Sequence, residues 1–477
     1  MSLQSMIANI EAPDLEPQLQ RRPHLREYPL ALNQQQVWSQ CQIDPESLVY
    51  NLGARMVISG PLDVPTFLRA IQNTVDRHEI LRTIFTMSED IPVRATAQIM
   101  STLTIQCPVR TLPLLKAEES EERAYARMKT LTKEIFDLAA GPLFRLELLR
   151  CGDSKFYFII AFHYLILDAF YCGQLMQEIA STYDLLRRGE PAPPPPDLQY
   201  GDFSLWLQER WNRQCLAQKA AFWQKQIREP LPQLHLPIAR PAPIIRPLTS
   251  QVTLRLEPEL VSKLNGVSNQ YQTTVFRVVV ATLALFFSRI TETNELMFDI
   301  DFSIRPKEMS HAIGSFTNNL PVRFEVQVEE SFHDLLSTVD LQLRQAAENR
   351  EFPVRRLAPK VTRPQDAIRP LSSILVTPLS PLDLPVGDLH LTGSISMTAT
   401  VYDLWITVME RGDTMEITFG HYDELFERDR IQRWAISLKK LLGEVVSQPD
   451  APIVHLDIVN ALKAERAAIS GIESSAG

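Results

Sequence analysis

Cysteine, glycine and long apolar runs are scarce in this sequence of 477 residues. The five cysteines form no Cys-x-x-Cys pair and no even disulfide framework, so we expect reduced thiols and no zinc knuckle. The longest apolar run, VVVATLALFF at 278–287, is too short for a membrane-spanning helix, which needs about 20 residues. It therefore predicts a buried helix in a globular protein.

Charge and motif content exclude several other classes. The chain carries 48 basic and 57 acidic residues, a net charge of −9, which argues against a basic nucleic-acid surface. It contains no HExxH motif, P-loop, GxGxxG or GxSxG, so we expect no metal and no bound ATP or NAD. The N-terminal segment lacks the apolar core of a signal peptide. We therefore expect a cytoplasmic protein with no nucleic-acid or membrane partner.

Proline is abundant, with 34 residues, and it clusters at 191–197 (PAPPPPD) and 230–248 (PLPQLHLPIARPAPIIRPL). An amphipathic helix is expected between the clusters, over 203–227, and would bridge two lobes. Both sides alternate helical and strand patterns, which predicts an α/β fold built twice. The expected divisions are an N-terminal extension (1–26), an N-terminal lobe (27–190), a Pro-rich joint with the bridging helix (191–248), a C-terminal lobe (249–466) and a flexible tail (467–477).

One buried strand leads into the residues that could carry chemistry. Seven apolar residues, 156–162, precede His163 and Tyr164, and Asp168 follows after LIL. A histidine in such a place is more often a core imidazole than a catalyst. A carboxylate there needs a cation or several hydrogen-bond donors to stay buried. Arg305, which ends the strand FDIDFSI, is the expected partner of Asp168.

Six or more segments together resemble the condensation domains of nonribosomal peptide synthetases. HYLILDA at 163–169 is similar to the HHxxxDG signature of that family, although two of its four defining positions differ. Further similarities occur in the family's order over about residues 27–466: ALNQQQVW (31–38), RHEILRTIF (77–85), YGDFSLW (200–206), IGSFTNNLPVRF (313–324), NREFPVRRL (349–357) and YDLWITV (402–408).

The resemblance implies a fold and a working arrangement. It implies two chloramphenicol-acetyltransferase-like lobes, in a V-shaped pseudo-dimer, with a tunnel between them. Phosphopantetheine arms of carrier proteins would bring an acyl or peptidyl thioester and an amine or hydroxyl acceptor into that tunnel. No cofactor would be bound directly by the domain itself.

Residue by residue, the signature gives this chain an atypical site. His163 matches the first His, Tyr164 stands in place of the second His, Asp168 matches the Asp, and Ala169 replaces the Gly. The second His is the one usually assigned to the attacking amine. A phenol keeps its proton at neutral pH and can hardly act as a base.

The resemblance assigns further residues to structure. It implies a buried salt bridge between Asp168 and Arg305, and it places Ala169, Asn318 and Trp405 along the tunnel. His163 and Tyr164 remain the candidate catalytic residues. An added β-carbon at Ala169 is harmless if its φ is negative and costly if it is positive.

Two functions remain open from the sequence. One is acyl transfer by a condensation domain that relies on orientation, which alone can contribute about 7–11 kcal/mol. The other is a catalytically inactive module that binds carrier proteins or recruits a tailoring enzyme. Heterocyclisation is disfavoured because that branch has Asp where this chain has His163. Candidate docking residues for acidic carrier proteins are Arg21 with Arg22 and Arg355 with Arg356.

Overall fold

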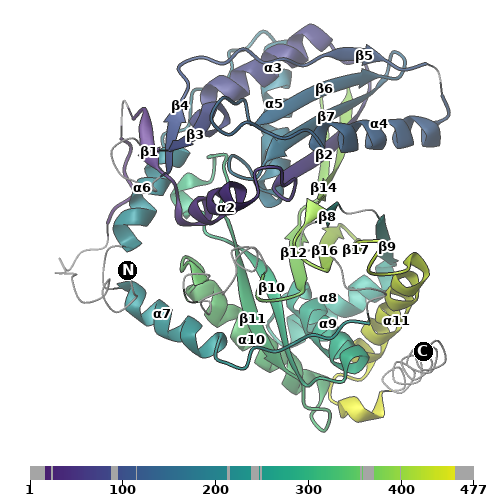
Figure 1. Cartoon of the computed structure of the whole chain (residues 1–477). Helices are drawn as coiled ribbons and strands as arrows, with labels where there is room; N and C mark the ends of the chain where they lie inside the picture. Colours follow the sequence, from purple (N-terminus) through teal and green to yellow (C-terminus); the bar gives the residue numbers. More distant parts are fainter. Residues whose placement is uncertain are drawn as a thin grey trace. The chain divides into compact units, whose positions relative to one another are not determined.

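A computed structural model shows the chain as two compact units (Figure 1). The first unit comprises residues 1–219, 303–317 and 380–400, and the second comprises 220–302, 318–379 and 401–477. The structure describes residues 17–22, 25–87, 95–113, 115–211, 215–237, 246–247, 250–354, 357, 370–397 and 399–456. Each unit contains its own six-stranded sheet and its own covering helices.

The first unit is built on a mostly antiparallel sheet in the order β13-β14-β2-β7-β6-β5. Only the β5–β6 pair is parallel. The strands are β2 (Asn51–Ser59), β5 (Val109–Thr111), β6 (Phe144–Arg150), β7 (Lys155–His163), β13 (Leu382–Val386) and β14 (Leu389–Met397). Central strand β7 is buried along almost its whole length, as its apolar sequence predicts.

Helices cover both faces of this sheet. Helix α4 (Ala117–Thr132) covers the sheet face to which Gly53 of β2 points. A Cβ added at Gly53 would lie 2.8 Å from Met128 Cγ of this helix. Side chains alternate along a strand, so Phe158 of β7 faces the opposite side. There it contacts Phe67 of α3 (Val64–Arg77), at 5.3 Å between ring centroids, and α3 packs on α5 (Ala169–Arg187).

Smaller elements complete the first unit. They are α2 (Leu32–Ile43), α6 (Tyr200–Trp211), the 3-10 helices at Glu79–Arg82 and Lys307–Met309, and a three-stranded antiparallel sheet of β1 (Glu27–Pro29), β4 (Ala95–Ile99) and β3 (Thr83–Met87). Helix α6 packs against β1 and α2. This arrangement places the N-terminal part of α2 beside the segment that follows β7.

The predicted lobe boundary at residue 249 differs from the structure. Strands β13 and β14 form a hairpin, and β14 pairs antiparallel with β2 over eight residue pairs, from His390 opposite Ser59 to Met397 opposite Leu52. Hydrogen bonding along the edge of β2 thus makes 380–400 part of the first sheet. Residues 303–317 also belong to the first unit. Composition and proline clustering do not indicate that residues 303–317 and 380–400 belong to the first unit.

The second unit has a mixed sheet in the order β11-β10-β12-β16-β17-β9. Strands β10, β12 and β16 are parallel, whereas β16, β17 and β9 are antiparallel. The strands are β9 (Ser250–Leu256), β10 (Glu295–Ser303), β11 (Thr317–Glu325), β12 (Ile374–Leu379), β16 (Leu404–Arg411) and β17 (Thr414–His421). The helices are α8 (Pro258–Gln270), α10 (Phe332–Glu348), α11 (Arg428–Ser447) and the central α9 (Val275–Thr291).

Helix α9 confirms the buried helix expected from the apolar run 278–287. Every residue of that run is buried, and α9 packs against α8, α10 and α11. Among the described residues, no single helix has both the length and the apolar character needed to cross a membrane. Helices α8 and α9, bent by 100°, satisfy those two criteria only as a pair.

The helix expected over 203–227 corresponds to two described helices, α6 and α7 (Cys215–Gln226), on either side of residues 212–214, which lie outside the described part. The bridging role of this region stays a prediction. So do the V-shaped arrangement of the lobes and the tunnel. The N-terminal extension and the tail lie wholly or mostly outside the described residues.

We predict that Gly314→Ala destabilises the first unit by about 1–3 kcal/mol, because a new β-carbon would overpack a filled core. The added Cβ would lie 2.1 Å from Cδ2 of buried Tyr200, whose hydroxyl donates to Ser315 O. Urea unfolding measures the change. The matched control is Gly173→Ala in α5, where the added Cβ has open space and the free energy of unfolding should rise by about 0.5–1 kcal/mol. Equal effects of the two changes would contradict this packing.

Candidate active site

The candidate site begins where β7 ends. Buried His163 is the last residue of β7 and lies opposite Asn51 of β2. The chain then turns through Tyr164, Leu165, Ile166 and Leu167 before α5 starts at Ala169. The HYLILDA segment thus runs from the last residue of β7 to the first residue of α5, and the hydrogen bonds of the turn between them decide how these residues are held.

Burial keeps His163 neutral. The imidazole is only 4% exposed, and desolvation lowers its pKa to about 3. Its Nδ1 accepts a hydrogen bond from Leu165 N at 3.2 Å, so the proton of the neutral ring lies on Nε2. Nε2 faces Cys41 Sγ at 3.8 Å. Neither ring nitrogen is therefore available to accept a proton at neutral pH.

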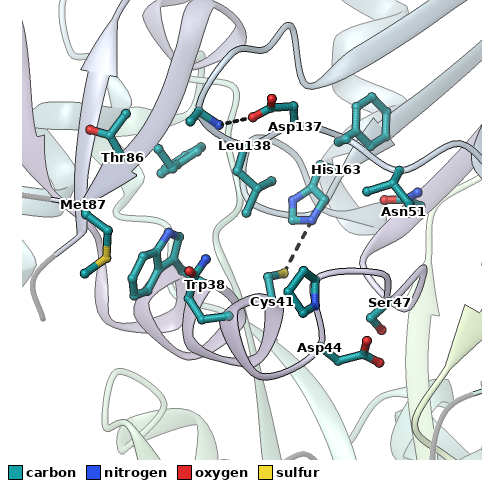
Figure 2. Close-up of a pocket in the computed structure, with 16 residues that line it drawn as sticks. Trp38, Cys41, Asp44, Ser47, Asn51, Thr86, Met87, Asp137, Leu138 and His163 are labelled. Carbon is teal, nitrogen blue, oxygen red and sulfur yellow. Dashed lines mark hydrogen bonds between the residues drawn. The ribbon is translucent and has the colours of Figure 1, made fainter.

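A cavity of about 350 Å³ opens beside this imidazole (Figure 2). We call it the Cys41 cavity. It is lined by the end of α2, the following loop, the end of β3, the 135–139 loop and His163; the lining residues are Trp38, Cys41, Gln42, Asp44, Pro45, Ser47, Asn51, Phe85, Thr86, Met87, Ile135, Phe136, Asp137, Leu138, Ala139 and His163. All of them belong to the first unit.

The thiol in this cavity is a poor nucleophile. Burial raises the pKa of Cys41 to about 12, with a smaller contribution from the nearby charge of Asp44. A neutral imidazole cannot stabilise a thiolate as an imidazolium would. The proximity of Cys41 and His163 therefore does not make a cysteine–histidine nucleophilic pair. The two side chains instead contribute one N–H group and one protonated thiol to the cavity wall.

Tyr164 follows the strand and is half-buried. Its backbone N donates to Tyr50 O at 2.8 Å, and the two rings have centroids 6.2 Å apart. The residues that line the Cys41 cavity include His163 and not Tyr164. The prediction that the Tyr164 ring lies along a tunnel remains untested.

Asp168 is held by hydrogen-bond donors. It is the N-cap of α5, and its Oδ1 accepts from Tyr171 N at 2.9 Å. Its Oδ2 accepts from Phe316 N at 2.7 Å, Thr317 N at 2.9 Å and Thr317 Oγ1 at 2.8 Å. We call these contacts the Asp168 network. They join the start of α5 to residues 316–317.

The expected salt bridge between Asp168 and Arg305 is not formed, which corrects the sequence-based expectation. Arg305 stacks over the Tyr171 ring, with Cζ 4.2 Å from its centroid, and donates to Gln174 Oε1. Asp168 instead has four donors, which satisfy a buried carboxylate without a cation. Burial raises the pKa of Asp168 to about 6, although the hydrogen bonds act in the opposite direction.

Two residues that sequence reasoning missed hold the neighbouring turns. Gln34 Nε2 donates to Leu165 O at 2.7 Å, and Asn33 Nδ2 donates to Ser315 O at 2.7 Å. Both come from the start of α2, in the segment ALNQQQVW. The resemblance of that segment to a family motif was visible in the sequence, but the role of its amides was not.

The three residues expected along a tunnel lie as follows. Ala169 is the first residue of α5, so its backbone is helical and the β-carbon costs no left-handed strain. In the second unit, Asn318 Nδ2 donates to Arg350 O and Phe352 O, at 2.8 and 3.1 Å. Trp405 is 2% exposed and donates from Nε1 to Thr377 Oγ1. Their place along a tunnel stays a prediction.

The candidate docking arginines are differently placed. Arg21 pairs with Glu79 and Asp202, at 2.9 and 3.0 Å, and Arg22 pairs with Glu209 at 2.6 Å. These ion pairs connect the residues before β1 to α6 and to the 3-10 helix at Glu79–Arg82. Arg355 and Arg356 lie outside the described residues.

Within the described part of the chain, no group of three His, Cys, Asp or Glu residues has the geometry to hold a metal ion.

Comparison with known proteins decides the family. Residues 24–467 match the family model described as Condensation domain. The chain belongs to the condensation-domain family. Curated relatives of this condensation domain include the dimodular nonribosomal peptide synthase of Bacillus subtilis (strain 168), 28% identical over 466 residues, and the chondramide synthase of Chondromyces crocatus, 25% identical over 445 residues.

These relatives are much longer than this condensation domain. The alignments cover 93% and 92% of this chain but only 19% and 11% of the two relatives. Among solved structures, the starter condensation domain of rhizomide synthetase matches with a TM-score of 0.79 and 20% identity, covering 91% of this chain and 98% of that one. The X-domain in its complex with OxyB from teicoplanin biosynthesis matches with a TM-score of 0.76 and 21% identity, covering 94% and 99%. These likenesses confirm the fold.

We predict that Asp168→Asn lowers the free energy of unfolding by about 2–4 kcal/mol, because an amide NH₂ would face backbone donors that then lose an acceptor. The control Thr317→Val removes one hydroxyl donor and should cost about 1 kcal/mol. Urea unfolding of the three proteins measures both changes.

The same variants give a pH dependence of known sign. The folded pKa of Asp168, about 6, lies above the usual 3.8, so the folded chain binds this proton more tightly than the unfolded chain does. The contribution of Asp168 to stability therefore falls as the pH rises from about 4 to about 6, and is constant above. The stability difference between wild type and Asp168→Asn should shrink over that interval. A difference that grows with pH would contradict the raised pKa.

Proposed function

We propose that this condensation domain binds acyl or peptidyl thioesters carried on the phosphopantetheine arms of carrier proteins, and that its signature provides no general base. The family supports the first part, since the curated relatives include a nonribosomal peptide synthase. The second part comes from this chain's own residues. The observation that carries it is the buried, neutral His163 with Nδ1 already occupied.

General-base catalysis needs a group that can take a proton near the working pH, and such a group commonly contributes about 10²–10⁴-fold in rate. His163 fails this requirement because its pKa is about 3 and its Nδ1 is engaged. Tyr164 fails it because a phenol holds its proton at neutral pH. Asp168 has a pKa of about 6, but it is fully buried and both of its oxygens already accept hydrogen bonds, so it acts as a structural group.

Slow transfer by orientation alone is the second candidate function. It is favoured by the intact Asp168 network, whose hydrogen bonds tie the end of the turn after β7 to Phe316. Holding a thioester and an amine together needs no proton acceptor in the signature. Recruitment of a tailoring enzyme is supported only by the shared fold of the teicoplanin X-domain, so it stays a prediction.

We predict that Tyr164→His increases acyl transfer between loaded donor and acceptor carrier proteins by at least about tenfold, because an imidazole supplies the missing base. The assay follows the acyl chain between the two carriers by intact mass. Tyr164→Phe is the matched control: it keeps the ring and removes the hydroxyl, and it should transfer no faster than wild type.

Carrier binding is measured on the same three proteins by calorimetry and should be equal. A wild-type rate that equals or exceeds that of Tyr164→His, and that falls in Tyr164→Phe, would show that the phenol itself takes part in proton transfer. That result would overturn the proposed absence of a base.

A further inference from the structure

We infer that the Cys41 cavity binds an uncharged aryl or aliphatic end of an acyl group and excludes free carboxylates. The inference rests on the proposed function for the source of that group, a carrier-bound thioester. The cavity itself is defined by residues of the first unit only. Its ligand can therefore be tested without any carrier protein.

The volume sets the size of the ligand. The cavity measures about 350 Å³, and it falls in the range of about 300–1,000 Å³ typical of small-molecule sites. An apolar cavity of about 150 Å³ is known to hold a benzene molecule. The Cys41 cavity thus has room for an aromatic ring with a short chain.

The lining is mixed: aromatic and aliphatic side chains lie beside polar amide, hydroxyl and carboxylate groups. Trp38, Phe85 and Phe136 are buried lining residues. Met87 and Ile135 also line the cavity and are 52% and 50% exposed, so they offer apolar surface that a ligand could cover. Burial of such surface by an apolar ligand is favourable by about 25 cal/mol per Å².

Charge decides against an anionic ligand. The formally charged lining residues are Asp44 and Asp137, both acidic. His163 is neutral there, because burial lowers its pKa to about 3. The nearby cation, Arg145, is not a lining residue; it stacks on Phe136 and donates to the backbone oxygens of Glu134 and Ile135. A carboxylate would meet repulsion and find no cation.

The His163 N–H is one of the polar groups of the lining that can orient the ligand. The Nε2–H of His163 has Cys41 Sγ as its partner, at 3.8 Å, and sulfur is a weak acceptor. A carbonyl oxygen of an acyl chain is a better acceptor for the same N–H. Figure 2 shows the imidazole of His163 and the thiol of Cys41 facing each other, with a dashed line between Nε2 and Sγ. A ligand there would lie against both groups.

Cys41 provides the reporter for the test. The purified chain is treated with methyl methanethiosulfonate at pH 9, and the modification rate of each cysteine is followed by peptide mass. The probe is the 4-phenylbutanoyl amide of N-acetylethylenediamine, an uncharged and unreactive analogue of a thioester. Cys107 and Cys151 are free and half-exposed and lie outside the cavity, so they serve as internal references.

With the probe at about ten times its dissociation constant, modification of Cys41 should slow about tenfold while the references are unchanged. The corresponding acetyl amide, which lacks the aryl chain, and 4-phenylbutanoate, which is anionic, should give no protection at the same concentration. Equal protection by the carboxylate, or none by the aryl amide, would overturn the inference.

A pair of neighbouring variants separates binding in the cavity from binding elsewhere. Ala139 lines the cavity and Ala140 does not, and both are exposed, so neither substitution perturbs the core. Ala139→Trp should abolish protection of Cys41, and Ala140→Trp should preserve it. Protection that survives Ala139→Trp would contradict binding in the cavity.

The result is independent of the transfer assay. Protection of Cys41 without carrier binding would support ligand binding in the cavity and contradict the proposed function. Carrier binding without protection would leave the proposed function and overturn the cavity inference.

Discussion

The carboxylate of Asp168 is the constraint on which the signature turn depends. It accepts four hydrogen bonds from its own helix, Phe316 and Thr317. A buried charge is tolerated only when such donors replace water. Its position at the N-cap of α5 adds the favourable field of the helix N-terminus. The same residues fix where the chain leaves the first unit and enters β11.

Much of the fold could be predicted from sequence because its signals are local. The run of apolar residues before His163 predicted β7, and the run at 278–287 predicted buried α9; both are confirmed. The exchange of β13 and β14 into the first sheet could not be predicted, since edge pairing with β2 is a long-range choice. The site was predicted in part. Sequence required a partner for Asp168 but could not tell whether a cation or several backbone donors would supply it.

The residues of the HYLILDA segment have structural contacts that do not depend on any role in catalysis. Asp168 accepts from the Phe316 amide and His163 accepts from the Leu165 amide, so both side chains hold the turn after β7. The resemblance of HYLILDA to the family signature aligns Tyr164 with the second His, which stays a prediction, and Ala169 fits a helical backbone without strain. The proposed absence of a general base is therefore compatible with this fold. The Cys41 cavity is lined by His163 and not by Tyr164.

The central claim is that His163 is neutral and cannot act as a base, and nitrogen NMR of the ¹⁵N-histidine-labelled chain tests it most directly. A His163→Gln variant assigns the signals. The account predicts a neutral ring protonated on Nε2 throughout the range from about pH 5 to about pH 8, since burial places the pKa at about 3. A titration of His163 near neutral pH, or a proton on Nδ1, would contradict the account.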